Sequence, residues 1–249
     1  MGHCVPDGAQ RPREPIPPVT QADRDAAFPA LSHGHTTHGA TTYTRVKFNR
    51  FEAWDSDEAS GQAWEGSASV GGDLHRVWLR SSGSRSAGRT TAASAELRWS
   101  RAVARWWDVV AGARHDVRPG PSRTRAAIGV QGLAPYQFEV SAMAYFGDGG
   151  VAAKLEAEYD LRFSNRLVLQ PMLELELQAR DDPARGPGTG SGLSKAEAGL
   201  RLRYEVTRRF APYLGLAHER SFGRTADYHA AHGEASRETR LVAGVRFWF

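Results

Sequence analysis

The sequence predicts an all-β fold, a single closed antiparallel transmembrane β-barrel of about 12 strands (roughly 10 to 14) with a disordered N-terminal tail. Apolar and polar residues alternate along most of the chain, its connections are in turn long and short, and aromatic residues gather beside the short ones. The mean hydropathy is −0.49, and no long apolar run exists, which excludes an ordinary transmembrane helix. A membrane-spanning strand, in contrast, needs only every second residue to be apolar.

The N-terminal segment, residues 1–41, is rich in Pro, His, Gly and Thr and has no sustained periodicity. Such a composition cannot bury a core, so we expect a flexible tail in which the stretch QADRDAAFPAL forms one helical turn at most. The alternating pattern begins at Thr42 and continues to the last residue. The sequence therefore predicts a tail, residues 1–41, followed by a barrel, residues 42–249.

The alternating segments are mostly long enough to cross a bilayer at a tilt. In the segment 166–180, leucines occupy one face, and glutamates and glutamines occupy the other. The first segment is the least regular, because Arg50 and Glu52 share a parity with the aromatic residues Phe48 and Trp54. The expected strands are 42–55, 63–71, 74–83, 91–102, 105–117, 123–133, 136–146, 150–163, 166–180, 194–207, 210–221 and 237–249.

The connections separate a barrel from a soluble sandwich, which would alternate too. Linkers such as SGSRSAGRT, DVRPGPSRT and RDDPARGPGTGSGL follow odd-numbered strands, and tight turns such as GGD, LAP and SN follow even-numbered ones, with GDGG as an exception. Long loops at one end and short turns at the other are typical of outer-membrane barrels. An even number of strands places both termini on the short-turn side, which is the periplasmic side.

The last strand, TRLVAGVRFWF, places Leu241, Val245 and Phe249 on one face and ends without a polar tail. A terminal strand with no partner would be an open edge, so we expect it to pair with the first strand and close the barrel. Aromatic residues such as Trp106 and Tyr136 lie close to the short turns, where a periplasmic aromatic girdle is expected.

The charge and cysteine content exclude some classes of partner and cross-link. The chain has 32 basic and 28 acidic residues and no basic cluster interleaved with aromatic residues, so we expect no nucleic-acid partner. Cys4 is the only cysteine, so no intramolecular disulfide can form. The opening residues MGHCVPDGAQRPREP lack an apolar core, so we expect no intact signal peptide in this sequence.

Several ordered blocks resemble the copper resistance protein B family over residues 17–249. These include GGDLHRVWLRS, WWDVVAGARHDVRPG, AAIGVQGLAPYQFEV, EAEYDLRFSNRLVLQP and VAGVRFWF. The resemblance implies a copper-handling barrel in the outer membrane of a Gram-negative cell, in contact with membrane lipid and copper. A periplasmic copper carrier or oxidase is the partner that it implies. The Met-rich tail that is common in the family is missing here.

The tail offers imidazole and thiol groups that could bind copper. His33, His35 and His38 lie close together on the flexible segment and could wrap around Cu(II). His3 and Cys4 form a second, smaller group. A polar low-complexity segment without metal function is the alternative for both groups.

The inward parity of the barrel predicts an acidic wall that carries two methionines. Met143 and Met172 are expected at similar depth, roughly 10 Å apart, with Glu156 between them, and could serve as successive weak stations for copper. The alternatives are that the charges form bracing ion pairs and that Met fills gaps in the interior. Inward acids such as Glu197 and Glu219 lie on later strands; the wall itself comprises Glu139, Glu156, Glu158, Asp160, Glu174 and Glu176.

These features favour a copper-binding platform or conduit with no catalytic activity. Copper is the ligand that we expect, and we expect that no cofactor is required for folding. The first alternative is a general small porin or structural barrel without a specific metal site, which would pass many solutes and bind no metal tightly. The second alternative is a lipid-modifying enzyme, which needs a Ser–His pair at the lipid boundary. His115 and His218 face outward, but no serine stands convincingly beside either.

Overall fold

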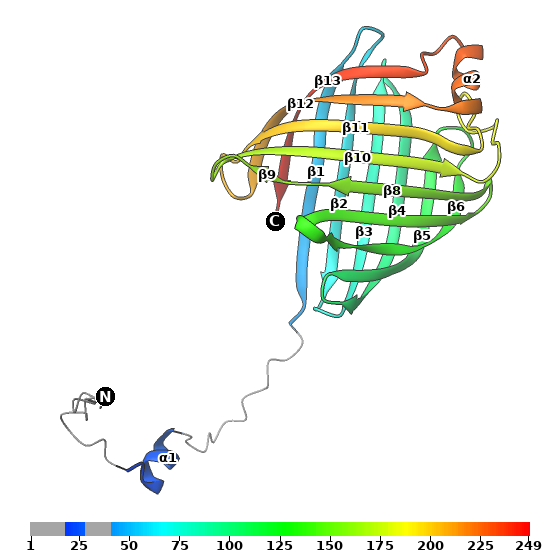
Figure 1. Ribbon diagram of the computed structural model, residues 1–249. Coiled ribbons are helices and arrows are strands. Elements are labelled where there is room, and N and C mark those ends of the chain that lie inside the picture. Colours follow the sequence, from blue (N-terminus) through cyan, green and yellow to red (C-terminus); the bar gives the residue numbers. More distant parts are fainter. Residues whose placement is uncertain (1–17, 28–40) are drawn as a thin grey trace, which may run out of the picture. The chain divides into compact units, whose positions relative to one another are not determined.

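The computed structural model describes residues 18–27 and 41–249 (Figure 1). The first range contains helix α1 (Gln21–Ala27), which is longer than the single turn expected from the sequence. Its start is capped reciprocally, because the Asp23 backbone N–H donates to Thr20 Oγ1 at 3.2 Å and the Thr20 backbone N–H donates to Asp23 Oδ2 at 2.8 Å.

The second range forms a closed antiparallel barrel of 12 strands, as predicted. Closure joins the last strand to the first: the Val46 N–H donates to the Phe249 carbonyl at 3.1 Å, and the Phe249 N–H donates to the Val46 carbonyl at 2.9 Å. The strand segments are β1 (Tyr43–Asp55), β2 (Ser60–Gly71), β3 (His75–Ser86), β4 (Arg89–Ala104), β5 (Trp107–Arg118), β6 (Arg123–Ala134), β7 (Phe138–Gly147), β8 (Gly150–Glu158), β9 (Leu161–Arg162), β10 (Leu167–Gln178), β11 (Gly192–Tyr204), β12 (Phe210–Ser221) and β13 (Arg237–Trp248).

One predicted strand, 150–163, is interrupted and appears as β8 and β9, which both pair with β10. The interruption lies opposite Pro171. The Tyr159 N–H donates to the Pro171 carbonyl at 3.1 Å, but proline has no N–H for the reciprocal bond. A proline on one strand therefore ends the regular pairing of its neighbour for two residues.

The distribution of side chains is inverted relative to a soluble protein. Leu79, Leu97 and Leu216 are more than half exposed on the outer face, whereas Arg98 and Arg203 are only 3% and 2% exposed inside. An apolar outside and a charged inside are what a lipid-embedded barrel requires. Among the described residues, no helix is long and apolar enough to cross a membrane.

The irregular parity of the first strand is explained by a β-bulge. The register of β1 shifts between Phe48 and Arg50, so that one extra residue is inserted there. Phe48 consequently faces outward and stacks on Phe247 at 4.6 Å between ring centroids, while Arg50 and Glu52 turn inward.

The two ends of the barrel differ. Two long connections, 179–191 and 222–236, lie at one end, and the second of them contains α2 (Gly223–Ala231) (Figure 1). We call this the loop end. The opposite turn end holds the 3₁₀ helix η1 (Pro135–Gln137), the beginning of β1, the end of β13 and exposed aromatic residues such as Tyr136 and Phe249.

The expectation of a long linker at SGSRSAGRT was wrong. β3 and β4 extend through this polar stretch and are joined by the two residues Ala87 and Gly88, which have φ of 47° and 76°. A two-residue hairpin with positive φ at both positions matches the strand twist. The stretch has the polar composition of a loop but forms two strand ends.

Candidate functional site: the charged lumen

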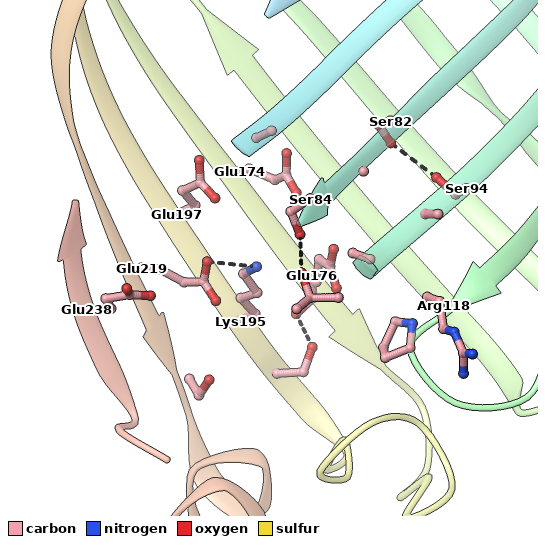
Figure 2. A pocket seen from close by; sticks show the side chains of 18 of the residues that line it. Ser82, Ser84, Ser94, Arg118, Glu174, Glu176, Lys195, Glu197, Glu219 and Glu238 are labelled. Carbon is pink, nitrogen blue, oxygen red and sulfur yellow. Dashed lines mark hydrogen bonds and ion pairs between the residues drawn. The ribbon is translucent and has the colours of Figure 1, made fainter. Parts of the chain in front are cut away.

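The lumen contains a cavity of about 610 Å³ on the side of the loop end. Strands β1–β4 and β10–β13 supply most of its walls, and residues of loop 179–191, such as Pro187 and Thr189, also line it. Figure 2 shows glutamates on one side and the serines of β3 and β4 on the other. Ser82 and Ser94 hydrogen-bond each other at 3.1 Å, so this part of the second wall is neutral and polar.

Five glutamates on the first wall stand side by side. Each is the register partner of the next across the adjacent strands β8, β10, β11, β12 and β13. Neighbouring strands lie about 4.8 Å apart, so the row extends over about 19 Å. We call it the glutamate row; its members are Glu156, Glu174, Glu197, Glu219 and Glu238.

Like charges directly opposite each other destabilise a sheet, so the glutamate row needs cations. Lys154 Nζ lies 2.8 Å from Glu156 Oε1 and 3.0 Å from Glu174 Oε1. Lys195 Nζ lies 2.9 Å from Glu219 Oε2, and Arg240 pairs with the same carboxylate. Each member is balanced by a side chain that the barrel itself supplies.

Six of these charged groups form a closed circuit across the lumen. Arg50 on β1 lies 2.9 Å from Glu65 and 4.0 Å from Glu174 on the facing wall. Arg80 on β3 lies 3.3 Å from Glu65 and 3.6 Å from Glu156. Lys154 closes the circuit, and the group forms the floor of the cavity. We call it the charge ring; its members are Arg50, Glu65, Arg80, Glu156, Lys154 and Glu174.

The opposite wall, on β3–β6, carries mostly arginines. Arg80, Glu96, Arg114 and Arg125 are successive register partners there. Arg114 pairs with Glu96 at 3.2 Å and with Asp116 at 2.7 Å. The lumen is thus polarised, with carboxylates concentrated on β8–β13 and guanidinium groups on β3–β6.

The predicted acidic wall divides into two parts. Glu156, Glu174 and Glu176 line the cavity, whereas Glu158 and Asp160 lie toward the turn end. Glu158 accepts hydrogen bonds from Gln170 at 3.0 Å and from Asn49 at 3.3 Å, and Asp160 pairs with Arg203 at 2.7 Å. Glu139 is the register partner of Glu158 and belongs to the same part.

The two methionines face inward, as the parity indicated, but lie at different levels. Met143 is in register with Lys154 and Glu176, whereas Met172 is in register with Glu158, four residues further along β10. Two strand spacings and four residues correspond to roughly 16 Å, more than the separation expected from the sequence. Met143 is 3% exposed within an apolar cluster that includes Val110 and Tyr145.

Met172 already has a polar partner. Its sulfur accepts a hydrogen bond from Arg201 Nη1 at 3.0 Å, and Arg201 also donates to both carboxylate oxygens of Glu52 at 3.1 Å. Tyr213 Oη donates to Glu52 at 2.9 Å. A copper ion at Met172 would have to displace this guanidinium. Parity alone did not place Glu52 among the inward acids, because it shares its parity with Phe48, and the bulge in β1 separates the two.

The histidines divide into those that the structure describes and those that it does not. His3, Cys4, His33, His35 and His38 lie outside the described residues. His115 and His218 face outward, and each hydrogen-bonds a threonine of the neighbouring strand, at 2.8 and 2.9 Å. Within residues 18–27 and 41–249, no three His, Cys, Asp or Glu side chains converge on a point where they could hold a metal ion.

Loop 179–191 is fastened over the mouth of the cavity. Asp182 pairs with Arg123 of β6, and Asp181 pairs with Arg224 of α2. The pKa of Asp181 is held below its ordinary value, chiefly because the Ser191 backbone N–H donates to it at 2.8 Å and also because Arg224 lies beside it. The Gly190 N–H donates to Thr225 Oγ1, again at 2.8 Å.

Comparison with known proteins agrees with this architecture. The family model of copper resistance protein B precursor (CopB) matches residues 42–249. A copper resistance protein B homolog of Pseudomonas syringae pv. tomato is 46% identical over 253 residues, which is 99% of this chain and 85% of that protein. Copper resistance protein B of Escherichia coli is 46% identical over 238 residues, 95% of this chain and 79% of that protein.

Among solved structures, the NanC porin has a TM-score of 0.52 at 11% identity, covering 82% of this chain and 99% of its own, which supports the fold alone. The sequence relatives carry the family assignment. This chain is therefore an outer-membrane β-barrel that belongs to the copper resistance protein B family and has a role in copper resistance.

Proposed function

We propose that the barrel binds copper ions in its loop-end cavity, on the wall formed by the glutamate row. The observation that carries this proposal is the alignment of five carboxylates, in register, on one side of a cavity of about 610 Å³. Carboxylates accept Cu(II), whereas thioethers favour Cu(I). With Met143 packed in an apolar cluster and Met172 bonded to Arg201, the cavity offers a site for Cu(II) in particular.

Glu176 is the strand-borne carboxylate of the cavity that forms no ion pair with Lys or Arg among the described residues, although its register partners are Lys154 and Lys195. It lines the cavity one step toward the loop end from Glu174, and it takes part in no ion pair among the described residues (Figure 2). Every member of the glutamate row, in contrast, already has a Lys or Arg partner. Copper would therefore be held by one or two carboxylates and water, weakly and in rapid exchange.

Passage of copper from the cavity to the turn end requires the charge ring to open. Two of its contacts span the lumen, Arg50–Glu174 at 4.0 Å and Arg80–Glu156 at 3.6 Å. A permanently open general porin would not have this circuit across its lumen, so we favour binding with gated passage. Copper resistance is the shared role of the family, and neither step needs a catalytic group.

The tail would act as a second collector. In this proposal both termini lie in the periplasm, because β1 begins and β13 ends at the turn end. His33, His35 and His38, with His3 and Cys4, would then exchange copper with a periplasmic carrier or oxidase. Imidazole nitrogens suit Cu(II) better than carboxylates do, so the tail would bind more tightly than the cavity.

The test is a titration of the full-length protein in detergent with Cu(II), followed by electron paramagnetic resonance. We expect two classes of site: nitrogen-ligated copper that disappears in the His33→Ala/His35→Ala/His38→Ala variant, and oxygen-ligated copper that weakens in Glu176→Gln. The matched control is Glu139→Gln, because Glu139 also forms no ion pair among the described residues but does not line the cavity. Oxygen-ligated copper that is absent, or that responds to Glu139→Gln alone, would refute the cavity site.

A further inference from the structure

The outer face of β12 and β13 carries two arginines directly opposite each other near the loop end. Arg220 and Arg237 are register partners, and both are exposed. They share the outward parity of Leu214, Leu216 and Leu241. Two like charges in this position destabilise the strand pair unless an anion lies between them.

Neither arginine has an acidic partner within the described residues, in contrast to lumen arginines such as Arg50 and Arg201. Arg220 lies over the ring of Phe222, at 5.1 Å from its centroid, and its side chain makes no hydrogen bond or ion pair with another described residue. On its other side, Arg220 is in register with Ala196 of β11. The small alanine side chain leaves space beside the guanidinium.

Successive rungs below this pair lead into the apolar band. The next outward rung consists of Ala198, His218 and Thr239, in which His218 Nδ1 and Thr239 Oγ1 lie 2.9 Å apart. The rung after that consists of leucines: Leu200, Leu216 and Leu241. Over four residues, roughly 13 Å, the surface changes from cationic through neutral polar to apolar.

This order of layers matches the order within a lipid molecule. An anionic headgroup would meet the two arginines, the neutral linkage region would meet the His–Thr rung, and the acyl chains would meet the leucines. Guanidinium groups bind phosphate through paired N–H donors, and two of them fit a phosphate monoester better than a singly charged diester. We propose that Arg220 and Arg237 form a binding site for the phosphate of a membrane lipid at the loop end of the barrel.

The experiment uses full-length protein in a non-ionic detergent and native mass spectrometry to count bound lipids. The probes are lipid A with its phosphates, the same lipid after dephosphorylation, and inorganic phosphate. We expect wild-type protein to retain phosphorylated lipid A and Arg220→Gln/Arg237→Gln to bind it at least tenfold more weakly, because charge-assisted hydrogen bonds are lost. The control Arg85→Gln/Arg89→Gln removes the same charge from exposed positions at the same end, where Arg85 donates to the Gly88 carbonyl, and should bind like wild type.

Three outcomes would overturn the proposal. They are equal binding by wild type and Arg220→Gln/Arg237→Gln, equal binding of dephosphorylated lipid, and equal loss in the control. Competition by millimolar inorganic phosphate that removes the lipid completely would assign the site to free phosphate and would also overturn it. Heat-modified mobility on gels, measured for each variant, ensures that only folded barrels are compared.

Discussion

Arg50 is the residue on which the charge ring depends most. It lies 2.9 Å from Glu65, 3.3 Å from Glu197 and 4.0 Å from Glu174, and its side chain is 18% exposed. In Arg50→Met, Glu65 keeps Arg80 and Glu174 keeps Lys154, but Glu197 loses its only ion pair among the described residues. The substitution therefore leaves Glu197 without an ion pair among the described residues and removes one ion pair each from Glu65 and Glu174.

The expected loss of stability follows from this burial. Removing one partner of a fully buried ion pair costs about 3–5 kcal/mol, whereas an exposed pair contributes up to about 1 kcal/mol. Since Arg50 is mostly buried, we expect Arg50→Met to lower the free energy of unfolding by about 2–3 kcal/mol. Urea titration of the folded protein in detergent, followed by tryptophan fluorescence, measures this loss.

The same substitution should open the charge ring. Without Arg50 the lumen-spanning contacts to Glu174 and Glu197 are absent, so in planar bilayers we expect cation-selective conductance to rise several-fold. Arg114→Met is the matched control, because Arg114 also holds two carboxylates, at 2.7 and 3.2 Å, but lies outside the ring. Equal conductance of Arg50→Met and wild type, or an equal rise in Arg114→Met, would refute a gate at the ring.

Three further predictions follow from other contacts. Arg201→Met leaves the buried Glu52 with Tyr213 as its only described partner and should lower the free energy of unfolding, measured by urea titration, by about 3–5 kcal/mol. The double variant Glu52→Gln/Arg201→Met should recover much of this loss. Losses that simply add would contradict a direct interaction between Glu52 and Arg201. Pro171→Val supplies an N–H that can donate to the Tyr159 carbonyl and should stabilise the barrel by about 0.5–1.5 kcal/mol. Hydrogen exchange at residues 159–161 should become slower. Unchanged exchange would contradict the explanation that Pro171 interrupts the strand. Because the pKa of Asp181 is lowered in the folded loop, its contribution to the stability of the loop is complete above the unfolded pKa and is lost as pH falls through the folded value. The amide of Ser191, which donates to Asp181, should therefore exchange hydrogen faster at pH 3 than the trend of its neighbours predicts. Asp181→Asn should abolish this difference.

The alternating pattern was sufficient to predict the strands, because a lipid-embedded barrel imposes a period of two on every spanning segment. The predicted strand bounds were wrong where a polar stretch belongs to a strand end outside the membrane and where a residue of another strand interrupts the pairing. The Ser- and Arg-rich tip of β3 and β4 was assigned to a loop, since strand ends beyond the apolar band need no outward apolar residue. The break at residues 159–160 reflects Pro171, which is on a different strand.

The site could be predicted only in part, because parity gives the face of a residue but not its level. Glu156 and Glu174 were expected to face inward, yet their alignment with Glu197, Glu219 and Glu238 depends on the stagger between neighbouring strands. The stagger is set by the closure of the barrel and has no local signal. The mixed parity around Arg50 was a sequence signal of the bulge in β1. This signal did not indicate which of the residues on either side of the bulge face the lumen.

The polarised lumen suggests where a cation would rest. A barrel braced only for stability could alternate acid and base along every rung, as Arg80, Glu96 and Arg114 do on β3–β5. On β8–β13 five carboxylates are instead aligned and neutralised from adjacent levels by lysines and arginines. This separation creates a field across the lumen that repels a cation from the arginine-rich wall and attracts it to the carboxylates. Among the described carboxylates that line the cavity from a strand, Glu176 is the one that forms no ion pair with Lys or Arg, and it lies two residues from Glu174 of the charge ring, toward the loop end.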